Sequence, residues 1–305
     1  MNGVINVNKP KGFTSSDVVA KLRGMSGGKK AGHTGTLDPD ATGVLPVCFG
    51  NATKACGLLT DEKKTYAAQM TLGITTDTLD TTGSVTAVYP VQVNREEITA
   101  AVMSFLGEQL QTPPMYSAIK QNGRKLYDIA RAGEEVYRAP RKVMFYGIEI
   151  NEIDLSGEPL KAVVRFTVTC SRGTYIRSLC DDIGRKLGTG AAMSDLVRTR
   201  VGIFTLENAL TLDELQAMKD AGHLADALFP TEQLFLQYPA FTMHQEKENL
   251  ALCGSQIGPE DGTFESASDG SIIRVRRADG TFIALYQYRK ERRWYQPYQM
   301  FLPSP

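Results

Sequence analysis

A loop rich in glycines and hydroxyl groups contains residue types that could do chemistry. Residues 32–39 (GHTGTLDP) hold two glycines, an imidazole, two threonines and one carboxylate just before a proline. Because a residue that precedes proline is pushed away from helical angles, we expect Asp38 in extended chain. An ionised carboxylate in such a loop could act as a nucleophile or stabilise positive charge. The same residues also suit an ordinary turn, so the loop alone does not decide.

Arg177 is the second residue that suggests a site. If Thr174 caps the following helix, Arg177 lies in the first turn, where the helix dipole disfavours a cation. Its partner within the helix would be Asp181, yet arginine four residues before aspartate is the weaker orientation. We therefore expect an anion from outside the helix. Asp38 and a phosphate group both remain candidates.

Two tyrosines stand at the ends of expected regular elements. Tyr66 opens a strand-like segment, and Tyr175 opens the helix that contains Arg177. Most tyrosines in such positions are half-buried packing residues. An enzyme that acts on an extruded nucleobase, however, needs an aromatic platform and polar groups around it.

Composition narrows the class of protein. The chain has 305 residues, 42% hydrophobic and 22% charged, with a formal net charge of zero. We expect a cytoplasmic protein, because no apolar run is long enough for a membrane helix and the N-terminus lacks an apolar signal core. Five scattered cysteines without CxxC spacing and three distant histidines predict neither a disulfide framework nor a metal site.

The order of strand and helix patterns predicts an α+β fold with a mostly antiparallel mixed sheet flanked by helices. We expect a large domain over residues 1–235 and a small β-rich domain over 236–305. Expected local features include helix caps at Asn51, Asn94, Thr174 and Thr211, a helix over 124–132, strands over 143–153 and 160–170, and turns at Ser156–Pro159, Asp269–Gly270 and Asp279–Gly280.

Several segments resemble the TruB-type tRNA pseudouridine synthases, in that family's order. They are NVNKPKGFTSSDVV, GHTGTLDPDATGVLPV, KTYAAQMTLGITTDTLDTTG, QTPPMYSAIKQNGRKLYDIARAG and CSRGTYIRSLCDDIGRKLGTGAAMSDLVRTRVGIF. The resemblance covers most of residues 1–205. It implies the pseudouridine synthase fold and a C-terminal domain similar to the RNA-binding PUA type. It also implies an isomerase that converts uridine 55 in the TΨC loop of tRNA to pseudouridine.

The resemblance also assigns roles. It implies that Asp38 is the catalytic aspartate, that Tyr66 stacks on the flipped uracil, and that Arg177 pairs with the aspartate. His33 matches a histidine of the loop that engages the T loop. Tyr175 and Leu196 match residues of the uracil pocket, and Lys9 belongs to a motif that supports the active-site loop. The only partner implied is the T arm of tRNA, bound by a monomer.

The chemistry agrees with a chain that lacks cofactor motifs. Isomerisation breaks the N-glycosidic bond, turns the uracil and joins C5 to the same sugar carbon, so it needs no cofactor. Three routes stay open: attack of Asp38 on the ribose, elimination to a glycal, and addition of the aspartate to uracil C6. Tyr66 is a candidate relay for the proton that leaves C5.

Two other interpretations compete with the synthase. One is a non-catalytic tRNA-binding or tRNA-folding module on the same scaffold. The other is a metal-dependent phosphoryl-transfer enzyme that uses Asp38 together with Asp40, and it predicts dependence on a divalent ion.

Overall fold

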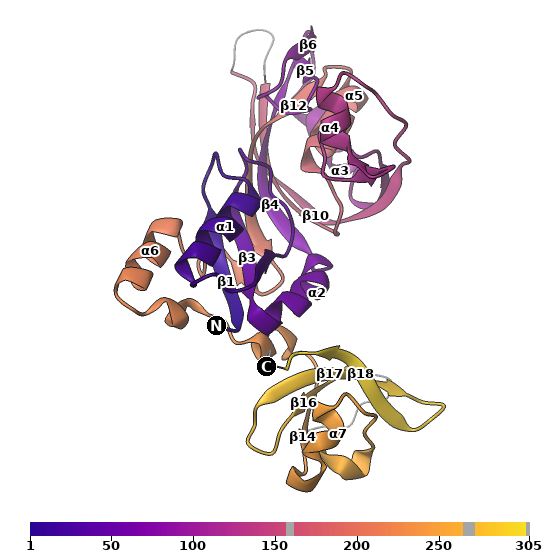
Figure 1. Ribbon diagram of the computed structural model, residues 1–305. Coiled ribbons are helices and arrows are strands. Elements are labelled where there is room, and N and C mark those ends of the chain that lie inside the picture. Colours follow the sequence, from indigo (N-terminus) through magenta and orange to yellow (C-terminus); the bar gives the residue numbers. More distant parts are fainter. Residues whose placement is uncertain (157–161, 265–271, 303–305) are drawn as a thin grey trace.

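The computed structural model describes residues 1–156, 162–264 and 272–302 (Figure 1). It contains a large sheet surrounded by helices and a smaller sheet formed by the C-terminal residues. The smaller sheet lies at one end of the molecule, beyond α2 (Cys56–Thr60) and the start of β1 (Gly3–Lys9), as Figure 1 shows. Within the described ranges, no helix is long and apolar enough to cross a membrane.

The large sheet has nine strands and confirms the expected α+β class. Seven of them follow one another across the sheet. In addition, β2 (Ala31–His33) pairs with β3 (Thr42–Phe49), and β13 (Phe204–Thr205) pairs with β12 (Ala191–Val201). Among the described strands of this sheet, only β3 and β12 pair in parallel. The spatial order is β1 (Gly3–Lys9), β3 (Thr42–Phe49), β12 (Ala191–Val201), β4 (Lys64–Leu72), β11 (Ala162–Cys170), β10 (Arg141–Asp154) and β7 (Gly107–Gln111).

The remaining strands form the C-terminal sheet and two short ribbons. The C-terminal order is β15 (Gly262–Phe264), β14 (Ala240–Met243), β16 (Ile272–Arg276), β17 (Phe282–Arg289) and β18 (Trp294–Met300). The ribbons are β5 (Ile74–Thr76) with β6 (Val85–Val88) and β8 (Lys120–Gln121) with β9 (Arg124–Lys125).

The α-helices are α1 (Ser15–Met25), α2 (Cys56–Thr60), α3 (Arg95–Met103), α4 (Leu126–Arg131), α5 (Ile176–Leu187), α6 (Leu212–Asp220) and α7 (Glu248–Leu252). Short 3-10 helices are η1 (Gly50–Ala55), η2 (Leu224–Ala227), η3 (Thr231–Phe235), η4 (Gln245–Lys247) and η5 (Pro259–Asp261). Asn94 and Thr211 cap α3 and α6 through complete capping boxes, as expected.

Separate apolar clusters hold the helices and the two sheets together. Helices α3 and α5 pack against β4, β10, β11 and β12, and helices α1 and α6 pack against β1 and β3. A third cluster joins the two sheets, because Leu285 and Phe301 of the C-terminal part contact Phe235 and the core beside β1. The C-terminal sheet also has its own core, which includes Phe241 and Tyr286.

Three local predictions were wrong, and two lie beyond the described residues. Helix α5 begins at Ile176 without a cap from Thr174, whose hydroxyl instead donates to the Ser171 carbonyl at 2.8 Å. Asn51 lies inside η1, and its amide donates to the carbonyl of Phe301. The helix expected over 124–132 is shorter, because its first two residues form β9. Most of the 156–159 turn and all of the 269–270 turn fall outside the described ranges.

Candidate active site

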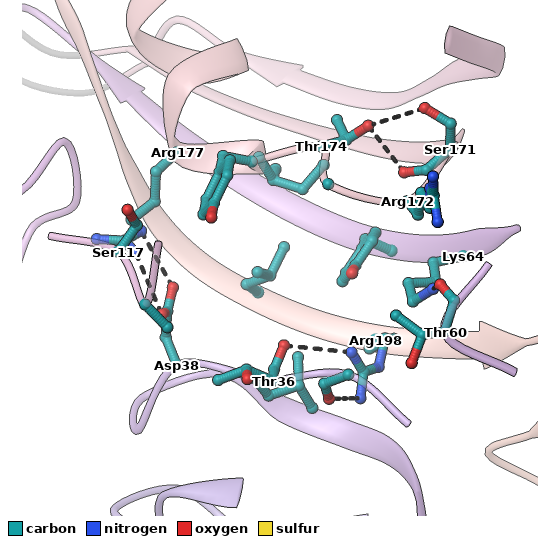
Figure 2. Close-up of a pocket in the computed structure, with 18 of the residues that line it drawn as sticks. Thr36, Asp38, Thr60, Lys64, Ser117, Ser171, Arg172, Thr174, Arg177 and Arg198 are labelled. Atoms are coloured by element: carbon teal, nitrogen blue, oxygen red, sulfur yellow. Dashed lines mark hydrogen bonds and ion pairs between the residues drawn. The ribbon is translucent and has the colours of Figure 1, made fainter. Parts of the chain in front are cut away.

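Asp38 and Arg177, which are 139 positions apart in the chain, form an ion pair. Asp38 follows β2 in the loop that leads to β3, and Arg177 is the second residue of α5. The Nε atom of Arg177 lies 3.0 Å from one Asp38 oxygen, and Nη2 lies 3.2 Å from the other. Two parallel contacts of this kind fix the orientation of a carboxylate as well as its charge. Figure 2 shows the pair at one end of the cavity.

Arg177 also contacts the loop between β5 and β6. Its Nη1 atom lies 3.5 Å from a carboxylate oxygen of Asp80 and 3.2 Å from the Thr78 carbonyl. Leu79, between them, has a φ of 64°, a strained angle for a residue with a side chain. The side chain of Arg177 is only 6% exposed. The arginine is therefore held by two carboxylates from different loops, Asp38 and Asp80.

Buried donors from other elements hold the loop around Asp38. The Lys9 ammonium is fully buried and donates to the carbonyls of Pro10, Phe13 and Pro39 at 2.6–3.0 Å. The Ser15 hydroxyl accepts from the Leu37 amide at 2.8 Å. The two residues on either side of Asp38 are thus tied to β1 and α1, which restricts the position of the carboxylate.

Apolar and aromatic side chains line a small cavity beside Asp38. Tyr66 on β4 and Leu196 on β12 are buried, and Tyr175 is half-buried at the start of α5. The Gln111 side chain bonds both the amide and the carbonyl of Tyr175, at 2.8 and 3.0 Å, which replaces the expected cap of the helix. Burial raises the pKa of Tyr66 to about 12, so its phenol stays protonated at neutral pH.

Two buried cations lie at the other end of this cavity. Arg198 stands directly opposite Tyr66 in the β4–β12 pairing, and Lys64 lies two residues before Tyr66, on the same face of β4. Arg198 donates to the carbonyls of Val44, Gly35 and Thr36 at 2.7–3.4 Å. Figure 2 shows Lys64 with Thr60 and Arg172 at the end away from Asp38.

Asp38 borders two cavities. The smaller one, about 320 Å³, extends from Asp38 past Tyr66 to Lys64. The larger one, about 860 Å³, runs from Asp38 over α1 and the β5–β6 loop to Tyr127 and Arg131 of α4. The small volume is at the lower end of the range for ligand pockets and suits a single base. A nucleotide could thus place its base in one cavity and its backbone in the other.

The electrostatic setting affects His33 and Asp38 differently. The Nδ1 atom of His33 accepts from the Gly35 amide at 3.3 Å, and burial lowers the pKa of this histidine, so the ring is neutral at pH 7. Removal from water raises the pKa of Asp38 above its ordinary value, while the charge of Arg177 acts in the opposite direction. The side chain of Asp38 remains 40% exposed toward the cavities.

The structure brings six of the predicted site residues to the two cavities: Asp38, Tyr66, Arg177, His33, Tyr175 and Leu196. Lys9 lies beneath the loop and reaches it through the Pro39 carbonyl. Sequence reasoning missed Asp80, Lys64 and Arg198. The sequence offers only weak signals for them: Lys64 shares a strand face with Tyr66, Arg198 shares one with Leu196, and Asp80 lies in an acidic loop, but none of these patterns places the residue at the cavity.

Two family models match consecutive parts of the chain, together residues 23–236. The family model described as TruB family pseudouridylate synthase (N-terminal domain) matches residues 23–176. The model described as tRNA pseudouridylate synthase B C-terminal domain matches residues 177–236.

Relatives and solved structures extend this match. The tRNA pseudouridine synthase B of Lachnoclostridium phytofermentans is 48% identical, and the alignment covers 99% of this chain and all of that protein. The same-named protein of Bacillus subtilis is 43% identical over 94% of this chain and 93% of its own. A chain from the crystal structure of a Cbf5–Nop10–Gar1 complex superposes with a TM-score of 0.72 at 28% identity, covering 99% of this chain and 85% of that one. The chain therefore belongs to the TruB family of pseudouridylate synthases.

Proposed function

We propose that this protein isomerises uridine 55 in the T loop of tRNA to pseudouridine, with Asp38 as the catalytic carboxylate. Membership of the TruB family and relatives named tRNA pseudouridine synthase B support the reaction and the class of substrate. The observation that carries the proposal is the Asp38–Arg177 pair at the junction of two cavities. The intact pair favours a catalyst over a module that only binds or folds tRNA.

Each residue around Asp38 has a separate role in the proposed reaction. The uracil enters the small cavity, stacks on Tyr66 and is enclosed by Leu196 and Tyr175, which keep the freed base from escaping. Asp38 then faces the ribose and acts on it as an anion, and Arg177 fixes its orientation. Because the Tyr66 phenol is protonated at neutral pH, a proton that leaves C5 would pass through its hydroxyl rather than to a standing phenolate.

The large cavity offers a surface for the RNA backbone. On its far rim the Lys125 ammonium lies 2.9 Å from the Tyr127 hydroxyl, and the Arg131 guanidinium lies over the Tyr127 ring at 5.5 Å. Cations beside an aromatic ring suit phosphate contacts and base stacking. His33 borders the same cavity near Asp38 and is placed to contact the T loop as a neutral ring.

The C-terminal residues complete the proposal. We assign residues 1–235 to a catalytic domain and residues 236–305 to a small PUA-like domain that binds the tRNA outside the T loop. Exposed arginines at the β17–β18 turn, Arg292 and Arg293, suit phosphate contacts there. The protein would act as a monomer on cytoplasmic tRNA, without a protein partner.

Position mapping in a full-length tRNA transcript tests the function. After incubation with the enzyme, pseudouridine is located by chemical labelling and primer extension. We expect one new pseudouridine, at position 55, and none in a transcript with cytidine there. Modification at a different uridine would contradict the proposed site, and its absence from every uridine, despite binding, would contradict the activity.

A further inference from the structure

The small cavity is charged oppositely at its two ends. At one end Asp38 and Asp80 contact Arg177. At the other end stand Lys64 and Arg198, and no carboxylate lies within ion-pair distance of either in the parts of the chain that the structure describes. Arg172 also borders this end but is paired with Asp61. Ordinary buried cations are paired, so two without a carboxylate beside a ligand pocket need a functional explanation.

Backbone carbonyls accept hydrogen bonds from both cations, and the Tyr66 phenol also lies beside Arg198, but these neutral partners leave the two charges in place. Lys64 donates to the carbonyls of Thr60 and Glu62 at 2.8 and 2.9 Å. The third N–H group of its ammonium is therefore available to donate to a ligand in the cavity. Lys64 Cε and an Arg198 nitrogen both approach Gly35, at 3.5 and 3.7 Å from the position a Cβ would take there. The two cations therefore lie side by side under the loop that leads to Asp38.

The proposed reaction separates charge along the same direction. When the N1–C1′ bond breaks, its electron pair goes to the uracil, and the ribose carbon becomes electron-poor. Either the Asp38 carboxylate bonds to C1′ or C2′ loses a proton, and in both routes the base departs as an anion. Its charge spreads from N1 to the two carbonyl oxygens. With C1′ beside Asp38, the far edge of the ring points toward Lys64 and Arg198.

We propose that Lys64 and Arg198 stabilise the uracil anion formed when the glycosidic bond breaks. This inference rests on the proposed function and adds two residues to its chemistry. Preorganised charge aimed at a developing anion is among the strongest devices available to an enzyme, since nothing must reorganise during the step. The later bond between C5 and C1′ consumes the anion, and as it forms the Asp38–C1′ bond breaks or, in the other route, C2′ regains its proton. C5 then loses its proton and N1 gains one from solvent. The net change is an isomerisation.

A comparison of leaving groups tests this role. Two T-arm stem-loops are prepared, one with uridine and one with 5-fluorouridine at the target position. Fluorine makes the departing base a more stable anion, so 5-fluorouridine depends less on help from the protein. The rate of glycosidic bond cleavage is measured in single turnovers by nucleoside analysis. For Lys64→Met we expect a loss of about 100-fold with uridine and about tenfold or less with 5-fluorouridine.

Lys9 supplies a matched control. It is also a buried lysine bonded only to carbonyls, and burial lowers the pKa of Lys9 and of Lys64 to about 8, so both are cations at pH 7. Lys9 does not border the small cavity. Lys9→Met should therefore slow both substrates by the same factor, as expected of a residue that only positions the loop.

The outcomes separate the two proposals. Equal losses on both substrates for Lys64→Met would overturn the assignment, since a purely structural role is indifferent to the leaving group. If Lys64→Met does not fold, as judged by its melting curve, Arg198→Gln makes the same comparison at the second cation. A wild-type protein that binds the stem-loop but converts no uridine contradicts the proposed function instead.

Discussion

The loop around Asp38 and the C-terminal sheet bury charge in different ways. Beside the loop, Lys9, Lys64 and Arg198 are buried against backbone carbonyls. In the C-terminal part, Arg274 is equally buried but pairs with Glu232. Burial without a counter-ion costs stability, whereas pairing recovers part of that cost. In our proposal Lys9 positions the loop, Lys64 and Arg198 beside the small cavity serve the reaction, and the Arg274–Glu232 pair serves structure.

The two regions also differ in how their aromatic and apolar side chains pack. The C-terminal core is rich in ring contacts, such as Phe241 with Phe264 at 4.5 Å between centroids and Phe264 with Tyr295 at 5.5 Å. The cavity wall near Asp38 instead presents Tyr66, Tyr175 and Leu196 to an open space. Substitutions in the first region should therefore change stability, and those in the second should change turnover.

The largest expected effect is at the acid. Asp38→Asn keeps the shape of the side chain but removes its charge, so turnover should fall by at least about a thousandfold while tRNA affinity stays near wild type. Single-turnover kinetics and filter binding measure the two quantities. Asp40→Asn is the control, because Asp40 is exposed and only two residues away. Equal losses in both variants would favour a metal site built from the two acids.

Arg177→Lys should follow, with a loss of about 100-fold in turnover, because a lysine cannot make two parallel contacts to Asp38 while reaching Asp80. The control is Arg185→Lys on the same helix, where the exposed arginine pairs with Asp181 and the change should be nearly silent. A near-normal rate for Arg177→Lys would reduce Arg177 to a helix-stabilising residue.

The pH dependence should show the raised pKa of Asp38. Only the ionised acid is active, so the rate should fall as pH drops through a value above the ordinary aspartate pKa of about 3.9. Arg177→Met removes the cation that opposes this shift and should move the acidic limb to higher pH. Single-turnover rates across the folded pH range measure it. A limb that does not move would mean that a different group controls the rate.

In the contrasting region, Phe301→Ala should act on stability. Phe301 is 1% exposed and packs between the two sheets against Phe235 and Phe282. Its replacement should cost about 3–5 kcal/mol of unfolding free energy, with a smaller cost for Phe301→Leu. Denaturant titration measures the change, and turnover per folded molecule should be unchanged. A large fall in turnover would erase the distinction between the regions.

The smallest effect is expected at the β17–β18 turn. Arg292→Ala with Arg293→Asn removes two exposed cations, and asparagine tolerates the φ of 55° at position 293. tRNA affinity should weaken modestly, and the slope of log affinity against log salt should fall by about one for each phosphate that these arginines neutralise in the wild type. An unchanged slope would remove this turn from the RNA-binding surface.

The sequence was sufficient to predict those features of the site and fold that follow from local patterns. The unfavourable place of Arg177 in its first helical turn predicted an external anion, and the structure supplies Asp38. The α+β class followed from strand patterns, and the strands expected over 143–153 and 160–170 are β10 and β11, which pair antiparallel. These predictions rest on patterns of residues close together in the chain, even where the partner, Asp38, lies 139 positions away.

What was missed depends on distant pairing. Gln111, not Thr174, bonds the start of α5 across 64 positions. The sequence did not single out Arg198, and only its register opposite Tyr66 on β4 places it at the cavity. Asp80, in the loop between β5 and β6, lies 3.5 Å from Arg177 on α5, 97 positions later in the chain. No local pattern in the sequence determines such contacts.

The most direct test of Asp38 catalysis follows tritium released from a T-arm stem-loop whose target uridine carries tritium at C5. Wild type and Asp38→Asn are run side by side, each with and without a chelator. We predict release from wild type alone, to one equivalent per stem-loop, unchanged by the chelator. Release by Asp38→Asn at the wild-type rate, or none from a wild-type protein that binds the RNA, would contradict that role.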